Sequence, residues 1–351
     1  MTKQEKIDNF DPSGVGIKNG HFIGLPFTEE DAQIVLLPVP WDVTVSFADG
    51  TSTGPQNILE CSSQLDLYDP DVPDAWKMGI YMRHLDLFWL NRNQELRPES
   101  EAYIDFLENG GDPDIDVHFK EVLEKINLAC EQLKKWVFEE TSKLMAAGKT
   151  VGIVGGEHSV PLGFLEALSK KYEGFGILQI DAHQDLRKAY EGFTYSHASI
   201  FYNALQLENI SQLVQVGIRD TCDEEMQLVA KNKARIKVWT DQQIREAAFN
   251  GTQYADICQQ IIAPLPHHVY ISFDIDGLNP ALCPNTGTPV PGGLTFAEAV
   301  YLIKAIVESG RQIIGFDLCE VAGLENDWDG NVGARVLYKL CNLMGKSLNT
   351  V

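Results

Sequence analysis

The sequence predicts an α/β fold, a three-layer α/β/α sandwich with a mainly parallel central sheet. Short β-rich runs alternate with longer helical patterns along most of the 351 residues. Several of these runs are apolar at consecutive positions, which is typical of strands that are buried on both faces of a parallel sheet. Such alternation indicates βαβ units, in which helices cover both faces of one sheet.

The expected strands lie at 32–40, 77–82, 149–156, 175–181, 212–218, 235–239, 267–276 and 311–318. The helical patterns between them lie at 117–147, 160–172, 198–207, 223–231, 240–248, 252–262, 295–309 and 331–345. The stretch "SFADGTSTGP" at 46–55 is expected to open a further helix. Residues 1–30 and 88–115 are interpreted as loops or partly ordered surface. Without a clear linker, we expect one domain over 1–351, with 1–30 as an N-terminal extension.

Composition excludes some classes of partner. The net charge of −22 argues against nucleic acid and anionic membranes, because both would repel the chain. The seven cysteines show no CxxC spacing, which is typical of reduced thiols in a cytoplasmic protein. The first residues lack the apolar core of a signal peptide, and no apolar run approaches the ~18–20 residues of a membrane span.

Metal-capable side chains follow three of the expected strands. They occur in "IVGGEHS", "ILQIDAHQD" and "YISFDIDGLNP". Sites in open α/β sheets form beyond the carboxyl ends of the strands, and alternate strand residues point to the same side. We therefore expect a cluster made of His158, Asp181, His183, Asp185, Asp274 and Asp276.

The spacing and charge of this set predict two metal ions. Asp181 and Asp185 would lie ~13 Å apart in a fully extended chain, so the polar turn "HQDLRK" has to bring Asp185 back. Four aspartates balance two divalent cations, and oxygen ligands with two histidines favour Mn²⁺ over tetrahedral zinc. Nickel and iron are also compatible. A single DxD pair is more often a helix cap or a loop ion pair, so the prediction depends on all three motifs together.

The motifs "GGEHS", "DAHQD" and "SFDIDGLNPALCPNTGTPVPGGL" resemble the signature regions of the ureohydrolases. This family includes arginase, agmatinase, guanidinobutyrase, formimidoylglutamase and guanidine hydrolase, and the similarity covers about 30–346. It implies an arginase-like fold and a binuclear manganese centre, with Ni²⁺ as the alternative. By position, one metal would be held by His158, Asp181, Asp185 and Asp274, and the other by Asp181, His183, Asp274 and Asp276, so that Asp181 and Asp274 bridge.

The same resemblance implies roles for three residues in the reaction. His197 in "TYSHAS" matches the histidine that shuttles protons, and Glu320 in "GFDLCEV" matches the carboxylate that binds the guanidinium. Asp185 would accept a hydrogen bond from the attacking water. From spacing alone, His197 is more often a helix cap or a surface group, and Glu320 is more often a solvated charge at a strand end.

The resemblance implies hydrolysis of a guanidino C–N bond with release of urea. Arginine is disfavoured as the substrate for two reasons. Cys222 in "GIRDTCDEE" stands where arginases have an aspartate in the loop that recognises the amino-acid end of the substrate, and "AHQDLRKAYEGF" lacks the asparagine-containing stretch that arginases use for the α-carboxylate. Glu157 and Asn279 also depart from the usual residues, but outside the ligand set. We expect a small cationic guanidino substrate, agmatine first, with arginine, guanidinobutyrate, free guanidine and formimidoylglutamate as alternatives. A homo-oligomer is implied. The rival hypotheses are a one-zinc deacetylase and a non-catalytic metal-binding homologue.

Overall fold

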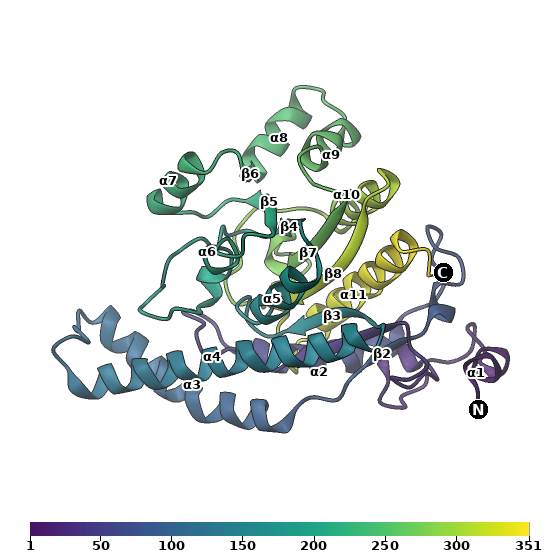
Figure 1. Ribbon diagram of the computed structural model, residues 1–351, viewed down its shortest axis with the longest axis horizontal. Helices are drawn as coiled ribbons and strands as arrows, with labels where there is room; N and C mark the ends of the chain where they lie inside the picture. Colours follow the sequence, from purple (N-terminus) through teal and green to yellow (C-terminus); the bar gives the residue numbers. More distant parts are fainter. Residues whose placement is uncertain (351) are drawn as a thin grey trace.

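The computed structural model describes residues 1–350, and a single eight-stranded sheet crosses its centre (Figure 1). The strands are β1 (Ile34–Val39), β2 (Ile80–Met82), β3 (Thr150–Gly155), β4 (Phe175–Ile180), β5 (Ile210–Ile218), β6 (Ile236–Thr240), β7 (His268–Asp274) and β8 (Gln312–Cys319). Their order is β2-β1-β3-β8-β7-β4-β5-β6, and every neighbouring pair is parallel. The predicted three-layer α/β/α fold is confirmed.

Helices cover both faces of this sheet. They are α1 (Lys3–Asn9), α2 (Gly54–Cys61), α3 (Leu87–Glu108), α4 (Val117–Ala146), α5 (Leu162–Lys171), α6 (Ile200–Ala204), α7 (Asp223–Lys231), α8 (Asp241–Phe249), α9 (Tyr254–Ile262), α10 (Phe296–Glu308) and α11 (Asp327–Ser347). Successive strand residues enter opposite apolar cores. In β4, for example, Leu178 packs with the core of α9–α11, whereas Ile177 packs with the core of α3–α6. This two-sided burial explains the continuous apolar runs in the sequence.

The strand order brings four carboxyl ends to one place. β3, β8, β7 and β4 are consecutive neighbours in the middle of the sheet, although they come from distant parts of the chain. Asp274 at the end of β7 pairs in register with Cys319 at the end of β8, and Phe273 pairs with Ile180 at the end of β4. Residues that follow these strands therefore meet at one edge.

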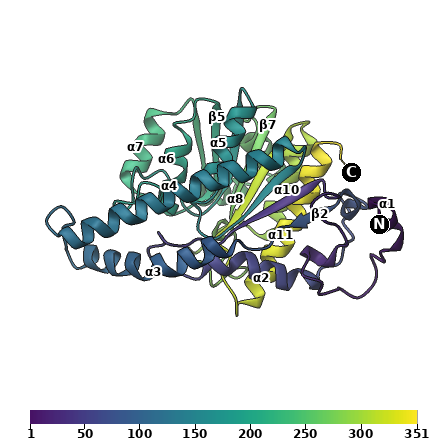
Figure 2. The same cartoon turned by 60° about the horizontal axis from the view of Figure 1, so that its bottom comes forward.

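The interpretation of 88–115 as loop or partly ordered surface is wrong over most of its length. Helix α3 fills Leu87–Glu108, begins at the N-cap Asp86, and lies beside α4 in a long pair that extends past the sheet (Figure 2). Its buried side recurs every three or four residues, but Pro98 and two polar members obscure the pattern. The buried residues are Trp89, Asn93, Leu96, Ser100, Tyr103 and Ile104.

The first thirty residues are also more ordered than expected. A capping box between Thr2 and Glu5 starts α1, and the Lys3 ammonium donates to the Met78 carbonyl at 2.6 Å. Phe22, Leu25 and Phe27 are fully buried in the core.

Several expected boundaries also shift. The strand expected at 77–82 begins only at Ile80, the helix expected at 198–207 covers Ile200–Ala204 after a 3₁₀ turn, and the strand expected at 267–276 ends at Asp274. The stretch at 46–55 does open a helix, because α2 begins at Gly54.

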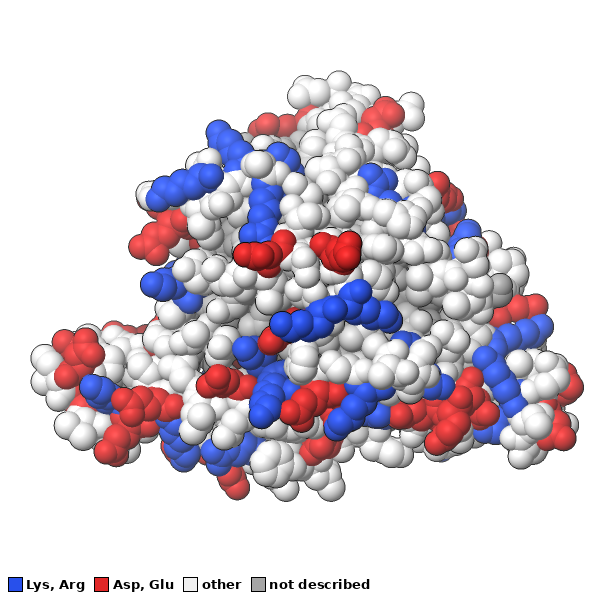
Figure 3. Space-filling view, viewed as in Figure 1, with Lys and Arg blue, Asp and Glu red and all other residues white. Residues whose placement is uncertain are grey.

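Membrane-spanning helices and the distribution of surface charge can both be examined in the structure. Within residues 1–350, no helix has the length and apolar character needed to cross a bilayer. Basic and acidic side chains are interspersed on the face in Figure 3, so the charge of −22 is not gathered there in one region.

Candidate metal centre

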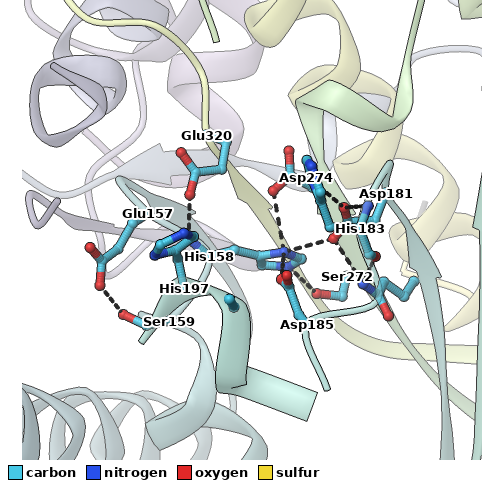
Figure 4. Close-up of polar contacts among 12 residues, drawn as sticks. Glu157, His158, Ser159, Asp181, His183, Asp185, His197, Ser272, Asp274 and Glu320 are labelled. Carbon is cyan, nitrogen blue, oxygen red and sulfur yellow. Dashed lines mark hydrogen bonds and ion pairs between the residues drawn. The ribbon is translucent and has the colours of Figure 1, made fainter. Parts of the chain in front are cut away.

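The six predicted ligands lie together at the carboxyl edge of the four central strands, and Figure 4 labels all of them except Asp276. We call them the metal cluster: His158, Asp181, His183, Asp185, Asp274 and Asp276. His158 follows β3, Asp181 is the first residue after β4, and Asp274 is the last residue of β7. All six are buried except the half-buried His183.

Two groups of ligand atoms share Asp181. His158 Nδ1 lies 3.0 Å from Asp181 Oδ2, 3.1 Å from Asp185 Oδ2 and 3.3 Å from Asp274 Oδ2. His183 Nδ1 lies 3.0 Å from Asp276 Oδ2 and 3.6 Å from Asp181 Oδ1. Asp181 thus offers one oxygen to each group, which is the geometry expected of a bridging carboxylate.

The turn after β4 brings Asp185 back toward the strand ends, as the sequence predicts. Asp185 has φ +54°, in the left-handed region that non-glycine residues rarely adopt. Its carbonyl accepts the Phe201 N–H at 3.0 Å, and the next N–H, of Leu186, donates to Glu225 Oε1 at 3.0 Å. These contacts hold a strained conformation that places the carboxylate beside His158.

Two further residues fix the ring of His158. Its Nε2 lies 2.9 Å from Ser272 Oγ, which donates to Asp317 Oδ2 at 2.7 Å. In the neutral ring that metal binding requires, we assign the proton to Nε2 from this network, which leaves Nδ1 to face the carboxylates as a ligand atom. Asp317 and Cys319 also lie near Nε2, but Ser272 already occupies that nitrogen. The sequence analysis missed Ser272 and Asp317, although Ser272 precedes Asp274 by two residues and pairs in register with Asp317.

Buried amides support the same carboxylates from below. Gln179 Nε2 donates to Asp181 Oδ2 at 2.8 Å, and Gln215 Nε2 donates to Gln179 Oε1 at 2.6 Å. The Ala182 N–H donates to Asp276 Oδ1 at 2.9 Å. Gln179 and Gln215 were also missed, because single polar residues inside apolar strands do not indicate a function by themselves.

The electrostatics of the cluster fit two divalent cations. Burial lowers the pKa of His158, but Asp181, Asp185 and Asp274 outweigh burial and raise it well above its ordinary value. Burial also opposes the charged form of His183, yet the Asp276 charge raises its pKa to about 12. These crowded carboxylates thus hold protons on both rings, and bound cations would replace those protons. Carboxylate oxygens with imidazole nitrogens suit Mn²⁺, Ni²⁺ or iron.

Glu320 and His197 line one pocket above the metal cluster. Glu320 has φ +62°, and its Oε1 accepts the His158 N–H at 2.9 Å. Its Oε2 is buried and finds no hydrogen-bond partner among residues 1–350. The His197 N–H donates to Thr44 Oγ1 at 3.1 Å, and its Nδ1 lies 3.5 Å from the same oxygen. Burial, followed by the charge of His183, lowers the pKa of His197 to about 3, so the ring is neutral at pH 7.

Glu157 takes no part in the cluster. Its Oε2 accepts the Thr44 N–H at 2.7 Å, and its Oε1 accepts the Thr44 hydroxyl at 2.8 Å. Burial raises the pKa of Glu157 to about 7. The sequence analysis did not identify Thr44, which connects Glu157 to His197.

The parallel sheet covered by helices, with this set of donors at its carboxyl edge, defines the class: an α/β protein with a candidate site for two cations. The chain belongs to the arginase family, whose model matches residues 32–342.

Curated relatives and solved structures agree with this assignment. N(1)-aminopropylagmatine ureohydrolase of Thermococcus kodakarensis is 31% identical over 90% of this chain and 92% of its own length. Agmatinase of Halalkalibacterium halodurans is 31% identical over 84% and 85%. Agmatine ureohydrolase of Thermoplasma volcanium has the same fold, with a TM-score of 0.69, 23% identity and coverage of 99% of both chains.

Proposed function

We propose that the chain hydrolyses a guanidino C–N bond of a small linear cation, agmatine in the first place, and releases urea. Membership of the arginase family makes it a hydrolase of guanidino compounds. The observation that carries the proposal is the unpartnered Glu320 oxygen, which lines a pocket directly above the metal cluster. Relatives named for agmatine and aminopropylagmatine support this choice of substrate.

The metal cluster would hold two Mn²⁺ ions, with Ni²⁺ as the alternative, and Asp181 and Asp274 would bridge them. When bound, the cation pair lowers the pKa of a water molecule and supplies hydroxide near neutral pH. Asp185 accepts a hydrogen bond from this nucleophile and is placed to take up its proton.

Glu320 orients the substrate. Its Oε2 is a buried acceptor without a donor, and a guanidinium group supplies N–H donors in a planar fork. The contact is charge-assisted, and it turns the planar guanidino carbon toward the metal cluster.

His197 transfers a proton to the departing amine. Because its ring is neutral in the free enzyme, His197 has to receive this proton before it donates it, and the attacking water supplies the proton by way of Asp185, which lines the same pocket. Its ring is held by Thr44 and Ser196, whose Oγ lies 3.3 Å from Nδ1.

Two charged side chains on the pocket wall act on the substrate tail in opposite directions. Asp220 lines the pocket and favours a cationic tail such as the amine of agmatine. Arg187 lines it as well, with its guanidinium carbon 4.6 Å from the ring centre of Tyr190. Arg187 therefore supports guanidinobutyrate, which has a carboxylate tail, as a second candidate. Cys222 forms the N-cap of α7, so arginine gains no aspartate at that position.

A substrate panel tests the proposal. The protein is stripped with a chelator, reloaded with Mn²⁺ or Ni²⁺, and assayed for urea release from agmatine, aminopropylagmatine, 4-guanidinobutyrate, arginine and guanidine. Elemental analysis measures metal per chain. We expect two metals per chain and the highest kcat/KM for agmatine or aminopropylagmatine. Protein that binds two metals and releases urea from none of these compounds would contradict the proposal.

We also propose that the chain forms a homo-oligomer in the cytoplasm. Its seven cysteines are all free thiols, which suits a reducing compartment. Light scattering during gel filtration tests the oligomer.

A further inference from the structure

The loop 42–50 forms part of the pocket wall without regular secondary structure of its own. Ser46 lines the pocket, and Thr44 contacts His197. Asp42 closes the loop on itself, because its Oδ2 accepts the N–H groups of Gly50 at 2.8 Å and Ser52 at 3.0 Å. Glu157 binds Thr44 directly through two hydrogen bonds, and any further restraint on Thr44 acts through the loop backbone on either side of it.

Helix α3 holds the loop with two side chains. Asn93 and Asp42 share two hydrogen bonds of 2.7 Å. Asn93 Oδ1 accepts the backbone N–H of Asp42, and Asn93 Nδ2 donates to Asp42 Oδ1. Arg97 Nη1 donates to the carbonyls of Val43 at 3.2 Å and Val45 at 2.7 Å. The Arg97 side chain is only 11% exposed, and its Nε lies 3.8 Å from Asp49 Oδ2. The carbonyls on both sides of Thr44 thus share one buried guanidinium.

We propose that Arg97 and Asn93 are positioning residues for the hydrolysis, because they hold loop 42–50 so that Thr44 fixes the ring of His197. This inference rests on the proposed role of His197. Neither residue is part of the metal cluster, so their effect reaches the reaction only through the loop. Arg97 Nη1 donates to both carbonyls, and an apolar side chain cannot reproduce these bonds. Small displacements of a group that transfers protons reduce turnover strongly.

The first test compares Arg97→Met with Arg92→Met. Arg92 lies on the same helix, and its ion pair with Glu95 at 3.2 Å is away from the loop. We expect Arg97→Met to bind two Mn²⁺ and to lower kcat for agmatine by about 10–100-fold, with a smaller change in KM. Arg92→Met should behave as wild type. If Arg97→Met does not fold, Arg97→Lys takes its place, with an expected loss of about 10-fold because the lysine ammonium sits on a flexible stem and holds the two carbonyls less rigidly.

A second readout does not use activity. Phe47 is 79% exposed in the middle of the loop and offers chymotrypsin a cleavage site. We expect the Arg97 variant to be cut after Phe47 several times faster than wild type, because the loop opens more often, and Arg92→Met to be cut at the wild-type rate. This result can be obtained even if no guanidino compound is hydrolysed, so failure of the proposed function and failure of the positioning role are distinguishable.

A double-mutant cycle completes the test. Thr44→Val removes the hydroxyl that accepts the backbone N–H of His197 and lies 3.5 Å from its ring Nδ1, and Thr44→Ser retains this hydroxyl. If Arg97 acts through Thr44, adding Arg97→Met to Thr44→Val should reduce kcat far less than Arg97→Met does alone. Thr44→Ser should keep most of the wild-type kcat. Full additivity of the two losses, or an Arg97 variant with wild-type kcat and wild-type cleavage after Phe47, would overturn the proposal.

Discussion

The metal cluster and the loops above it contribute to one pocket, but they are held in place by different means. Each group of ligands directly follows or ends a strand of the central sheet. The loop wall, which we define as 42–50 and 187–199, is held by side chains of α3 and α4. For example, the Tyr103 hydroxyl donates to the Glu191 carbonyl at 2.9 Å, and Asn127 Nδ2 donates to that of Gly192 at 3.1 Å.

This difference separates chemistry from recognition. Strand ends in a buried sheet fix the ligand positions rigidly, whereas loops held by side chains tolerate changes in sequence. We therefore expect changes in the metal cluster to remove metal and activity together. Changes in the loop wall should alter rate, specificity or stability while both metals stay bound.

The largest effect is expected from Asp274→Asn. It keeps the shape but removes a negative charge that two cations would share, so metal content should fall below two per chain and kcat should fall by more than ~10²-fold. Elemental analysis and urea release measure the two effects. Asp329→Asn is the control, because Asp329 is equally buried but pairs with Asn285 at 3.0 Å. Two tightly bound metals and full activity in Asp274→Asn would show that this residue does not bridge.

The next largest effect is expected from His197→Ala. His197 contributes a proton-transfer group and no metal ligand, so both metals should stay while kcat falls by ~10²–10³-fold. The exposed His118→Ala serves as the control. Loss of metal from His197→Ala would show that His197 is a metal ligand. His197 would then belong to the metal cluster and not to the loop wall.

A smaller effect, on specificity, is expected from Arg187→Gln. Removal of a cation from the pocket wall should lower KM for agmatine and raise KM for 4-guanidinobutyrate, each by about 2–5-fold, the range of a partly exposed charge interaction. KM for guanidine, which has no tail, should not change. Parallel changes for all three compounds would argue that Arg187 shapes the pocket and does not select the tail.

The smallest effect is expected from Glu191→Gln in the loop wall. Burial, followed by the charge of Glu108, raises the pKa of Glu191 to about 7. Between pH ~4.5 and ~7 the folded chain keeps a proton that the unfolded chain loses, so this group's contribution to stability falls as pH rises. At pH 8 the variant should melt about 1–2 °C above wild type. At pH 4.5 the variant and the wild type should melt at the same temperature. A thermal scan at both pH values checks this, and an equal shift at both would contradict it.

The sequence predicted that the six residues of the metal cluster lie together because their positions depend on local order. Asp181 and Asp274 come at strand ends that apolar runs already mark, and their spacing by two or four residues limits where His183 and Asp185 can lie. The strand order could not be predicted, since it depends on contacts between β3, β8, β7 and β4, which are far apart in the chain.

The loop wall was not predictable for the opposite reason. Its supports are single polar residues on a helix, and Asn93 and Arg97 in "NRNQELRP" resemble ordinary surface residues. Their function appears only when α3 lies against 42–50. The strained backbone of Asp185 and Glu320, both with positive φ, was equally invisible, because tertiary contacts and not local preferences hold it.

The strand order also couples folding to metal supply. The ligands come from the ends of β3 and β7 and from the turn after β4. These segments lie side by side only in the assembled sheet, where β8 and β7 stand between β3 and β4. The unfolded chain therefore has no preformed site, and we expect cations to bind mainly to the folded chain. At a free metal concentration 100 times Kd, one such site raises the free energy of unfolding by about 2.7 kcal/mol. In a cell that withholds the ion, this protein would thus lose stability and lifetime as well as activity.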